Sequence, residues 1–196
     1  LYHIDFSSSP LALGGSAFAQ SQGKVGDDVA RVASADYFRD AFNAVQQLVQ
    51  EGLLLAGHDI SAGGLITCLL EMCFARVEGG LDVDLAKFRD TDLVRILFAE
   101  NPGVVVQVAD AHKKRFLEVL DAAGVACVKI AKPCDERHVM VHFHGADYQF
   151  GVDYLRDVWY KTSYLLDTRQ SFHGCARQRY ENYGRQPLEF HFHPEF

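Results

Sequence analysis

A glycine-rich turn at residues 58–64 carries the residue types that could bind a metal ion and a phosphate. Its sequence is HDISAGG, directly before an apolar run of helical length. The carboxylate of Asp59 offers hard oxygen ligands to Mg²⁺. The hydroxyl of Ser61, and a backbone made accessible by Gly63 and Gly64, could contact a phosphate at the start of the helix. The turn therefore predicts a metal–phosphate site, with Asp59 as the metal ligand and Ser61, Gly63 and Gly64 at the phosphate.

The same turn also has a purely structural interpretation. Ser61 could cap the helix, Asp59 could pair locally, and the two glycines could permit tight packing. Short glycine motifs often match by chance. Spacing alone leaves both interpretations open.

Other polar segments give weaker signals. The glycine pair at residues 14–16 (GGS) could open a helix towards an anion, but no carboxylate stands at comparable spacing. His58 is interpreted as a hydrogen-bonded structural group, and Glu100 as part of an ordinary polar turn. Several further histidines lack a third ligand at a defined spacing, so no metal site is predicted at His138, His142, His144, His191 and His193.

The sequence lacks a complete catalytic set. It contains no nucleophile elbow, no P-loop and no glycine-flanked cysteine of the kind that hydrolyses glutamine. We therefore predict that this chain supplies no catalytic residue and that it is inactive by itself.

Composition and charge exclude several classes of protein. The 19 basic and 26 acidic residues give a net charge of −7 without a basic face, so nucleic acid is not an expected partner. Charges interrupt every long apolar run, which argues against a membrane span. Five irregularly spaced cysteines favour a reducing compartment, and we expect a cytoplasmic location. Both ends of the chain are interpreted as cuts in a longer polypeptide.

Strands and helices alternate around the turn. Short apolar runs predict strands at residues 1–6, 53–56, 80–85, 104–109, 125–130, 138–143 and 147–150. Apolar residues at helical spacing predict helices between residues 34 and 52 and at residues 65–75, 91–99, 111–123 and 152–166. This order predicts an α+β fold, in which a mixed sheet of ferredoxin-like character packs against helices.

The periodic pattern dissolves beyond Asp167. Residues 168–196 mix Arg, Gln, Tyr, His and Phe without a sustained period. Such a segment is typical of an extended arm that docks on a neighbouring surface. We therefore divide the chain into a domain at residues 1–167 and an extended C-terminal arm or linker at residues 168–196.

Three ordered motifs resemble those of one enzyme family. They are LGGSAFAQ at residues 13–20, HDISAGGL at residues 58–65, and LFAE at residues 97–100, which leads into GVVVQV at residues 103–108. With these motifs the chain resembles the AIR-synthase-related C-terminal domain of phosphoribosylformylglycinamidine synthase. It is similar to the second such domain of the large single-chain bacterial form, just before the glutaminase domain.

The resemblance implies a function. That family uses ATP and glutamine-derived ammonia to convert formylglycinamide ribonucleotide into formylglycinamidine ribonucleotide in purine biosynthesis. It implies that Asp59 coordinates Mg²⁺ and that Ser61 contacts ATP or ADP, at the structural rather than the catalytic nucleotide site. The implied partners are the ATP-binding and glutaminase domains of the same polypeptide and small-molecule substrates.

Two alternatives to this reading remain. One is a non-catalytic module that holds nucleotide and supports assembly. The other is a stand-alone ATP enzyme of the AIR synthase superfamily, against which the C-terminal arm at residues 168–196 argues. Family members often carry Asp where this chain has Ala62, so the resemblance implies no second carboxylate there.

Overall fold

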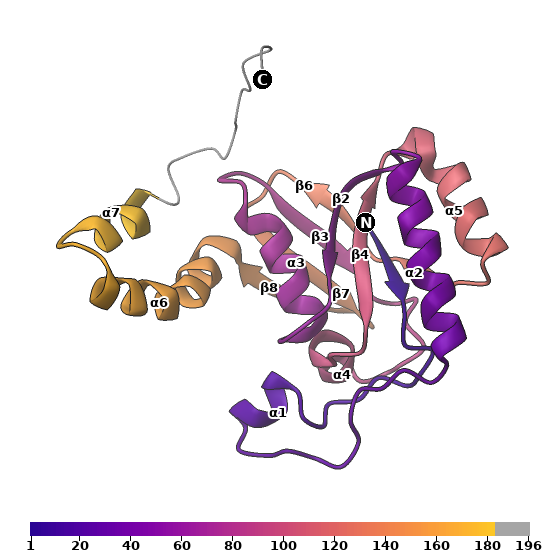
Figure 1. The fold of residues 1–196 in the computed structure, drawn as a ribbon, viewed down its shortest axis with the longest axis horizontal. Helices are drawn as coiled ribbons and strands as arrows, with labels where there is room; N and C mark the ends of the chain where they lie inside the picture. The colour runs from indigo at the N-terminus through magenta and orange to yellow at the C-terminus, as the bar shows by residue number, and fades with distance from the viewer. Residues whose placement is uncertain (183–196) are drawn as a thin grey trace.

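The computed structural model describes residues 1–182, whose strands form two four-stranded sheets (Figure 1). The strands are β1 (Tyr2–Asp5), β2 (Leu54–Asp59), β3 (Gly80–Asp84), β4 (Gly103–Val108), β5 (Cys127–Lys129), β6 (Ala131–Cys134), β7 (His138–Phe143) and β8 (Ala146–Gly151). The first sheet has the order β2-β4-β1-β5 and is antiparallel throughout. The second has the order β6-β3-β7-β8, with β3 and β7 parallel.

Helices pack on both faces of the first sheet. The α-helices among residues 1–182 are α1 (Ala17–Ser21), α2 (Ala35–Gln50), α3 (Gly64–Phe74), α4 (Leu93–Phe98), α5 (Lys113–Ala122), α6 (Val152–Gln170) and α7 (Cys175–Asn182). Helices α2 and α5 form one apolar core with one face of this sheet. On the other face, α3 and α4 share a larger core with the inner face of the second sheet (Figure 1). The predicted α+β fold with a mixed sheet packed against helices is thus confirmed.

Local sequence accounts for the most regular elements. Ser34 caps α2, since its hydroxyl accepts a hydrogen bond from the backbone N–H of Tyr37 at 3.2 Å. The helix ends before Gly52, whose φ of +66° suits glycine.

Strand β2 is longer than its apolar run predicts, because pairing with β4 extends it to Asp59. Strand β6 was not predicted as a separate strand: residues 127–134 divide between the two sheets.

The first part of the predicted arm is helical rather than extended. Residues 168–170 continue α6, and α7 packs against it. The Arg179 guanidinium pairs with Asp167 at 2.6 Å, and the rings of Tyr180 and Tyr164 stack at 4.6 Å. Ion pairs and ring stacking stabilise this hairpin, rather than a row of buried apolar side chains along one helix face. For this reason the sequence shows no apolar residues at regular helical spacing there. The remaining predicted arm, residues 183–196, lies outside the described residues.

Deleting residues 168–196 is expected to change the free energy of unfolding of the remaining chain by less than about 1 kcal/mol. The reason is that α6 contributes to the core near its start, where Val152 is fully buried and Leu155 packs beside it. Urea denaturation of the 1–167 and 1–196 chains measures the difference. Loss of the cooperative transition on deletion would mean that the arm belongs to the core.

No helix among residues 1–182 combines the length and the apolar character that crossing a membrane requires.

Candidate functional site

The predicted nucleotide turn joins the edge strand β2 to α3. Asp59 is the last residue of β2 and lies opposite Val104 of β4. Its side chain is 71% exposed, and Ser61 is exposed as well. The structure therefore places the predicted metal ligand and the predicted nucleotide contact on the surface, beside the start of a helix.

The two glycines of the turn have conformational and packing roles. Gly63 and Gly64 have φ values of +89° and +73°, in the left-handed region. A Cβ atom on Gly64 would lie 2.7 Å from the carbonyl oxygen of Leu97 and 2.7 Å from backbone atoms of Phe98. Gly64 therefore lets the start of α3 pack directly on the end of α4, as the structural interpretation of the turn expects.

Glu100 contacts this turn directly. Its Oε1 atom accepts a hydrogen bond from the backbone N–H of Gly63 at 2.8 Å and another from that of Ala17 at 2.8 Å. The interpretation of Glu100 as an ordinary polar turn is wrong, because its carboxylate links two segments that are distant in sequence. No local signal could have found this role, because both partners lie far away in sequence.

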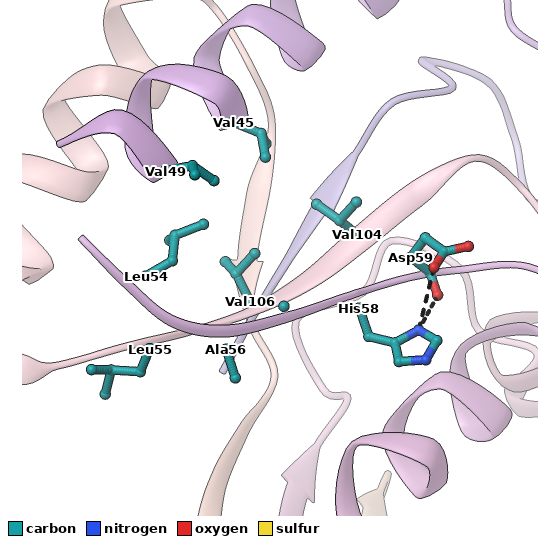
Figure 2. A pocket seen from close by; sticks show the side chains of 10 residues that line it. Val45, Val49, Leu54, Leu55, Ala56, His58, Asp59, Val104 and Val106 are labelled. Carbon is teal, nitrogen blue, oxygen red and sulfur yellow. Dashed lines mark hydrogen bonds and ion pairs between the residues drawn. The ribbon is translucent and has the colours of Figure 1, made fainter. Parts of the chain in front are cut away.

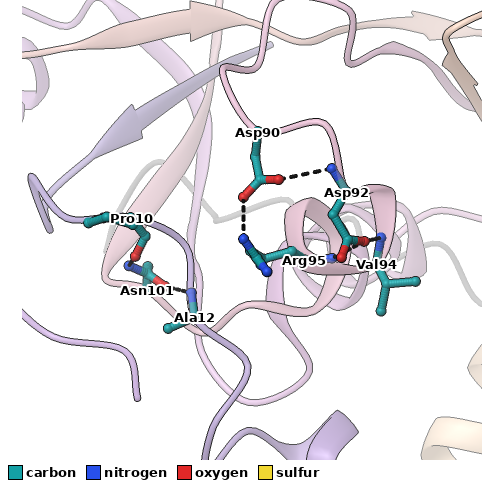
Figure 3. A network of polar contacts seen from close by, with 7 residues as sticks. All are labelled: Pro10, Ala12, Asp90, Asp92, Val94, Arg95 and Asn101. Atoms are coloured by element: carbon teal, nitrogen blue, oxygen red, sulfur yellow. Dashed lines mark hydrogen bonds and ion pairs between the residues drawn. The ribbon is translucent and has the colours of Figure 1, made fainter. Parts of the chain in front are cut away.

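The neighbouring Asn101 holds the segment that leads to the first glycine pair. Its side chain is buried, and its Oδ1 accepts a hydrogen bond from Ala12 N–H at 3.1 Å (Figure 3). Its Nδ2 donates to the carbonyl of Pro10 at 3.0 Å and to Ser9 Oγ at 3.1 Å. Sequence reasoning missed this role, since nothing in the local pattern shows what a buried amide will contact.

The weaker candidate at residues 14–16 lies beside the turn because of Glu100. Ser16 caps α1, with its hydroxyl accepting a hydrogen bond from Ala19 N–H at 3.2 Å. A side chain on Gly14 would collide with the backbone carbonyl of Asp28. These contacts explain the glycine and the serine structurally, whereas the two hydrogen bonds to Glu100 link the start of α1 to the start of α3.

The corner that carries Glu100 and Asn101 follows α4, whose own start is fixed by acidic side chains. Asp92 caps the helix, because its Oδ1 accepts a hydrogen bond from Val94 N–H at 2.9 Å (Figure 3). Asp90 lies 3.4 Å from the Arg95 guanidinium and accepts a hydrogen bond from Asp92 N–H at 2.9 Å. The corner is therefore anchored at both ends, by this cap and by Asn101.

His58 is hydrogen-bonded within the fold, as predicted. Its Nδ1 lies 2.8 Å from the carbonyl oxygen of Asp59 and 3.5 Å from the Asp59 carboxylate (Figure 2). Its Nε2 lies 3.4 Å from Glu71, which also accepts a hydrogen bond from the indole N–H of Trp159 at 2.8 Å. The imidazole thus connects the end of β2 to α3 and α6.

A cavity of about 500 Å³ lies along β2 (Figure 2). Val45 and Val49 of α2 line one side, and residues 54–59 line the other. Asp59 stands at its polar end, whereas Ser61 and the two glycines lie outside its lining. The cavity thus reaches the first two residues of the glycine turn but not Ser61, Gly63 or Gly64.

Residues 1–182 contain no group of three or more His, Cys, Asp or Glu side chains arranged to hold a metal ion. His142 instead lies between Asp147, at 2.6 Å, and Asp82, at 3.0 Å, and the hydrogen bond to Asp147 raises its pKa. His191 and His193 lie outside the described residues. Among the described residues, Asp59 is therefore not part of such a group of three side chains.

Comparison with known proteins identifies the domain type. The model of the family "AIR synthase related protein, C-terminal domain" matches residues 6–144. The probable phosphoribosylformylglycinamidine synthase of Arabidopsis thaliana is 33% identical over 197 residues, which cover 100% of this chain and 14% of that protein. The synthase of Homo sapiens is 35% identical over 182 residues, which cover 91% of this chain and 14% of that protein. The chain therefore spans about a seventh of these relatives.

Solved structures share the fold at lower identity. T. maritima PurL complexed with FGAR has a TM-score of 0.62 and 20% identity, over 79% of this chain and 27% of that chain. E. coli HypE, a hydrogenase maturation protein, has a TM-score of 0.53 and 15% identity, over 78% of this chain and 49% of that chain. The similarity to the synthases confirms the resemblance seen in the three motifs. Because the family model covers more than half of the chain, including the glycine turn and Glu100, the chain belongs to the family of AIR synthase related protein C-terminal domains.

Proposed function

We propose that this chain is the second AIR-synthase-related C-terminal domain of a large single-chain phosphoribosylformylglycinamidine synthase. Such a ligase would convert formylglycinamide ribonucleotide into formylglycinamidine ribonucleotide with ATP and glutamine. The observation that carries the proposal is the similarity to synthases over 91% to 100% of the chain, which extends beyond residue 144, where the family model ends. That extent favours a synthase over a stand-alone enzyme that shares only the common domain.

In this proposal Asp59 binds Mg²⁺ and Ser61 contacts the phosphates of ATP or ADP. The donor chemistry fits, because the Asp59 carboxylate is 71% exposed and supplies hard oxygen ligands. Bound Mg²⁺ would neutralise phosphate charge next to this carboxylate. Gly63 and Gly64 shape the turn that presents both side chains at the start of α3. T. maritima PurL, which shares the fold, has been solved in complex with ATP and with ADP.

The role we propose for this site is to retain a structural nucleotide. Asp59 supplies a single carboxylate, and no wider metal cluster accompanies it within residues 1–182. The remaining ligands, the reacting substrates and the glutamine-hydrolysing nucleophile would belong to the ATP-binding and glutaminase domains of the same polypeptide. This chain by itself would then be inactive. Its five cysteines are all unpaired, which supports a reducing compartment such as the cytoplasm.

Asp59→Asn in the full-length synthase is expected to remove most of the stabilisation that Mg-ADP gives. A ligand at a hundredfold over its dissociation constant stabilises the folded state by about 2.7 kcal/mol, and the amide removes the charge that holds the metal. Thermal-shift titration with Mg-ADP measures the loss. Asp121→Asn, at an exposed position on α5, is the matched control and should behave as wild type.

Two other results would change the proposal. If Asp59→Asn and wild type were stabilised equally, Asp59 would not bind the metal. If turnover fell while nucleotide was retained, the site would be catalytic rather than structural. The alternative of a nucleotide-holding and assembly module without any contribution to turnover predicts loss of nucleotide and stability alone.

A further inference from the structure

One oxygen atom of Glu100 ties together the starts of two helices. Oε1 accepts the backbone N–H of Ala17, 83 positions away in sequence, and the backbone N–H of Gly63, 37 positions away. Ala17 is the first residue of α1, and Gly63 is the N-cap of α3. At α3 the carboxylate of Glu100 accepts from the N–H of the N-cap residue itself, the group that the glutamate of a capping box would accept from.

Glu100 is carried by a rigid corner. Leu97, Ala99 and Asn101 are each less than 5% exposed. The corner also contacts both helix starts independently of the carboxylate. The ring of Phe98 stacks on that of Phe18 in α1 at 4.6 Å, and Gly64 packs against the backbone of residues 97–98. Because this support is rigid, the Glu100 carboxylate has a defined position. Its hydrogen bonds therefore also fix the positions of the Ala17 and Gly63 backbone.

The turn held by Glu100 is the one that presents Asp59 and Ser61. Three residues separate Asp59, at the end of β2, from Gly63. Pairing of β2 with β4 fixes the Asp59 end, and the hydrogen bond from Glu100 fixes the Gly63 end. Without that bond, the left-handed Gly63 could rotate and change where the Ser61 hydroxyl lies relative to the Asp59 carboxylate.

We propose that Glu100 is a positioning residue for Mg-nucleotide binding. It holds the turn at residues 59–63 in its binding conformation through the bond to Gly63. The inference rests on the function proposed for Asp59.

The test compares Glu100→Ala and Glu100→Gln with wild type in the full-length synthase. Calorimetric titration gives the dissociation constant for Mg-ADP, and thermal unfolding without nucleotide gives the stability. Loss of one hydrogen bond to a charged acceptor corresponds to about a tenfold change, so Glu100→Ala should weaken Mg-ADP binding by about tenfold or more. Glu100→Gln keeps a carbonyl oxygen that can accept the same bonds, so it should restore part of that loss. Glu118→Ala, on the exposed face of α5, should leave binding unchanged.

A purely structural Glu100 would give a different result. Thermal stability would fall in Glu100→Ala while the dissociation constant stayed at the wild-type value, and that result would overturn the inference. If Glu100→Ala fails to fold, wild-type affinity in Glu100→Gln overturns it as well, because loss of the charge should weaken the bonds. Asp59→Asn is measured in parallel. If it weakens binding and Glu100→Ala does not, only this inference fails, whereas wild-type affinity in Asp59→Asn removes the proposed function.

Discussion

Gly64→Ala should lower the free energy of unfolding by about 4 kcal/mol, since a left-handed φ and a backbone collision each cost about 1–3 kcal/mol. The φ of Gly64 is +73°, and its new Cβ would lie 2.7 Å from backbone atoms of Leu97 and Phe98. Backbone atoms at the buried end of α4 cannot move aside as a flexible side chain can. The loss would be a large part of the 5–15 kcal/mol that stabilises a typical domain.

Gly124→Ala separates the cost of a left-handed φ from the cost of the backbone collision. Gly124 follows α5 with a φ of +64°, but a Cβ there would meet no atom within 4 Å. Only the conformational cost of about 1–2 kcal/mol should appear. Urea denaturation of both variants and of wild type gives the comparison. Equal losses at the two positions would show that the packing of α3 on α4 tolerates a side chain.

Arg137→Ala is expected to lower the free energy of unfolding by about 3 kcal/mol, because it removes a charged donor from three carbonyl groups, two of them in partly buried hydrogen bonds. Its guanidinium donates to the carbonyl oxygens of Cys73 at 3.1 Å, Gly79 at 3.0 Å and Arg76 at 2.7 Å. It also pairs with Asp153 at 3.0 Å, and its side chain is only 18% exposed. One side chain thus fastens the end of α3 and the following loop to the start of α6.

Arg115→Ala is the matched control for this effect. Arg115 also forms two hydrogen bonds with a carboxylate, that of Glu51, but its side chain is 49% exposed. Exposed pairs of this kind contribute at most about 1 kcal/mol. Arg137→Lys should recover little of the free energy of unfolding that Arg137→Ala loses, because one ammonium group cannot reproduce the planar set of donors of the guanidinium. If Arg137→Ala were no more destabilising than Arg115→Ala in urea, the guanidinium would not be what holds the end of α3.

The sequence alone predicted the elements whose formation depends on near neighbours. Helix α2 is an example, because Ser34, the apolar spacing and Gly52 are all local signals. Helix α3 was predicted in the same way, from an apolar run that follows a glycine turn. The motifs that carry the family resemblance are also local, and they predicted Asp59 and Ser61 in one turn between a strand and a helix, which the structure shows to be exposed. The metal and nucleotide roles of these residues stay predictions that the Asp59→Asn experiment tests.

Only the tertiary structure decided which distant segments meet. The division of residues 127–134 between two sheets depends on pairing with β1 and β3, which lie far away in sequence. The hairpin of α6 and α7 depends on contacts of Asp167 with Arg179 and of Tyr164 with Tyr180. The sequence therefore contains no periodic apolar pattern that would predict it. Glu100 resembles any turn glutamate in sequence, because its role depends on N–H groups 37 and 83 positions away. Hydrogen bonds of that range follow from how the chain packs, and a local pattern of residue types does not contain them.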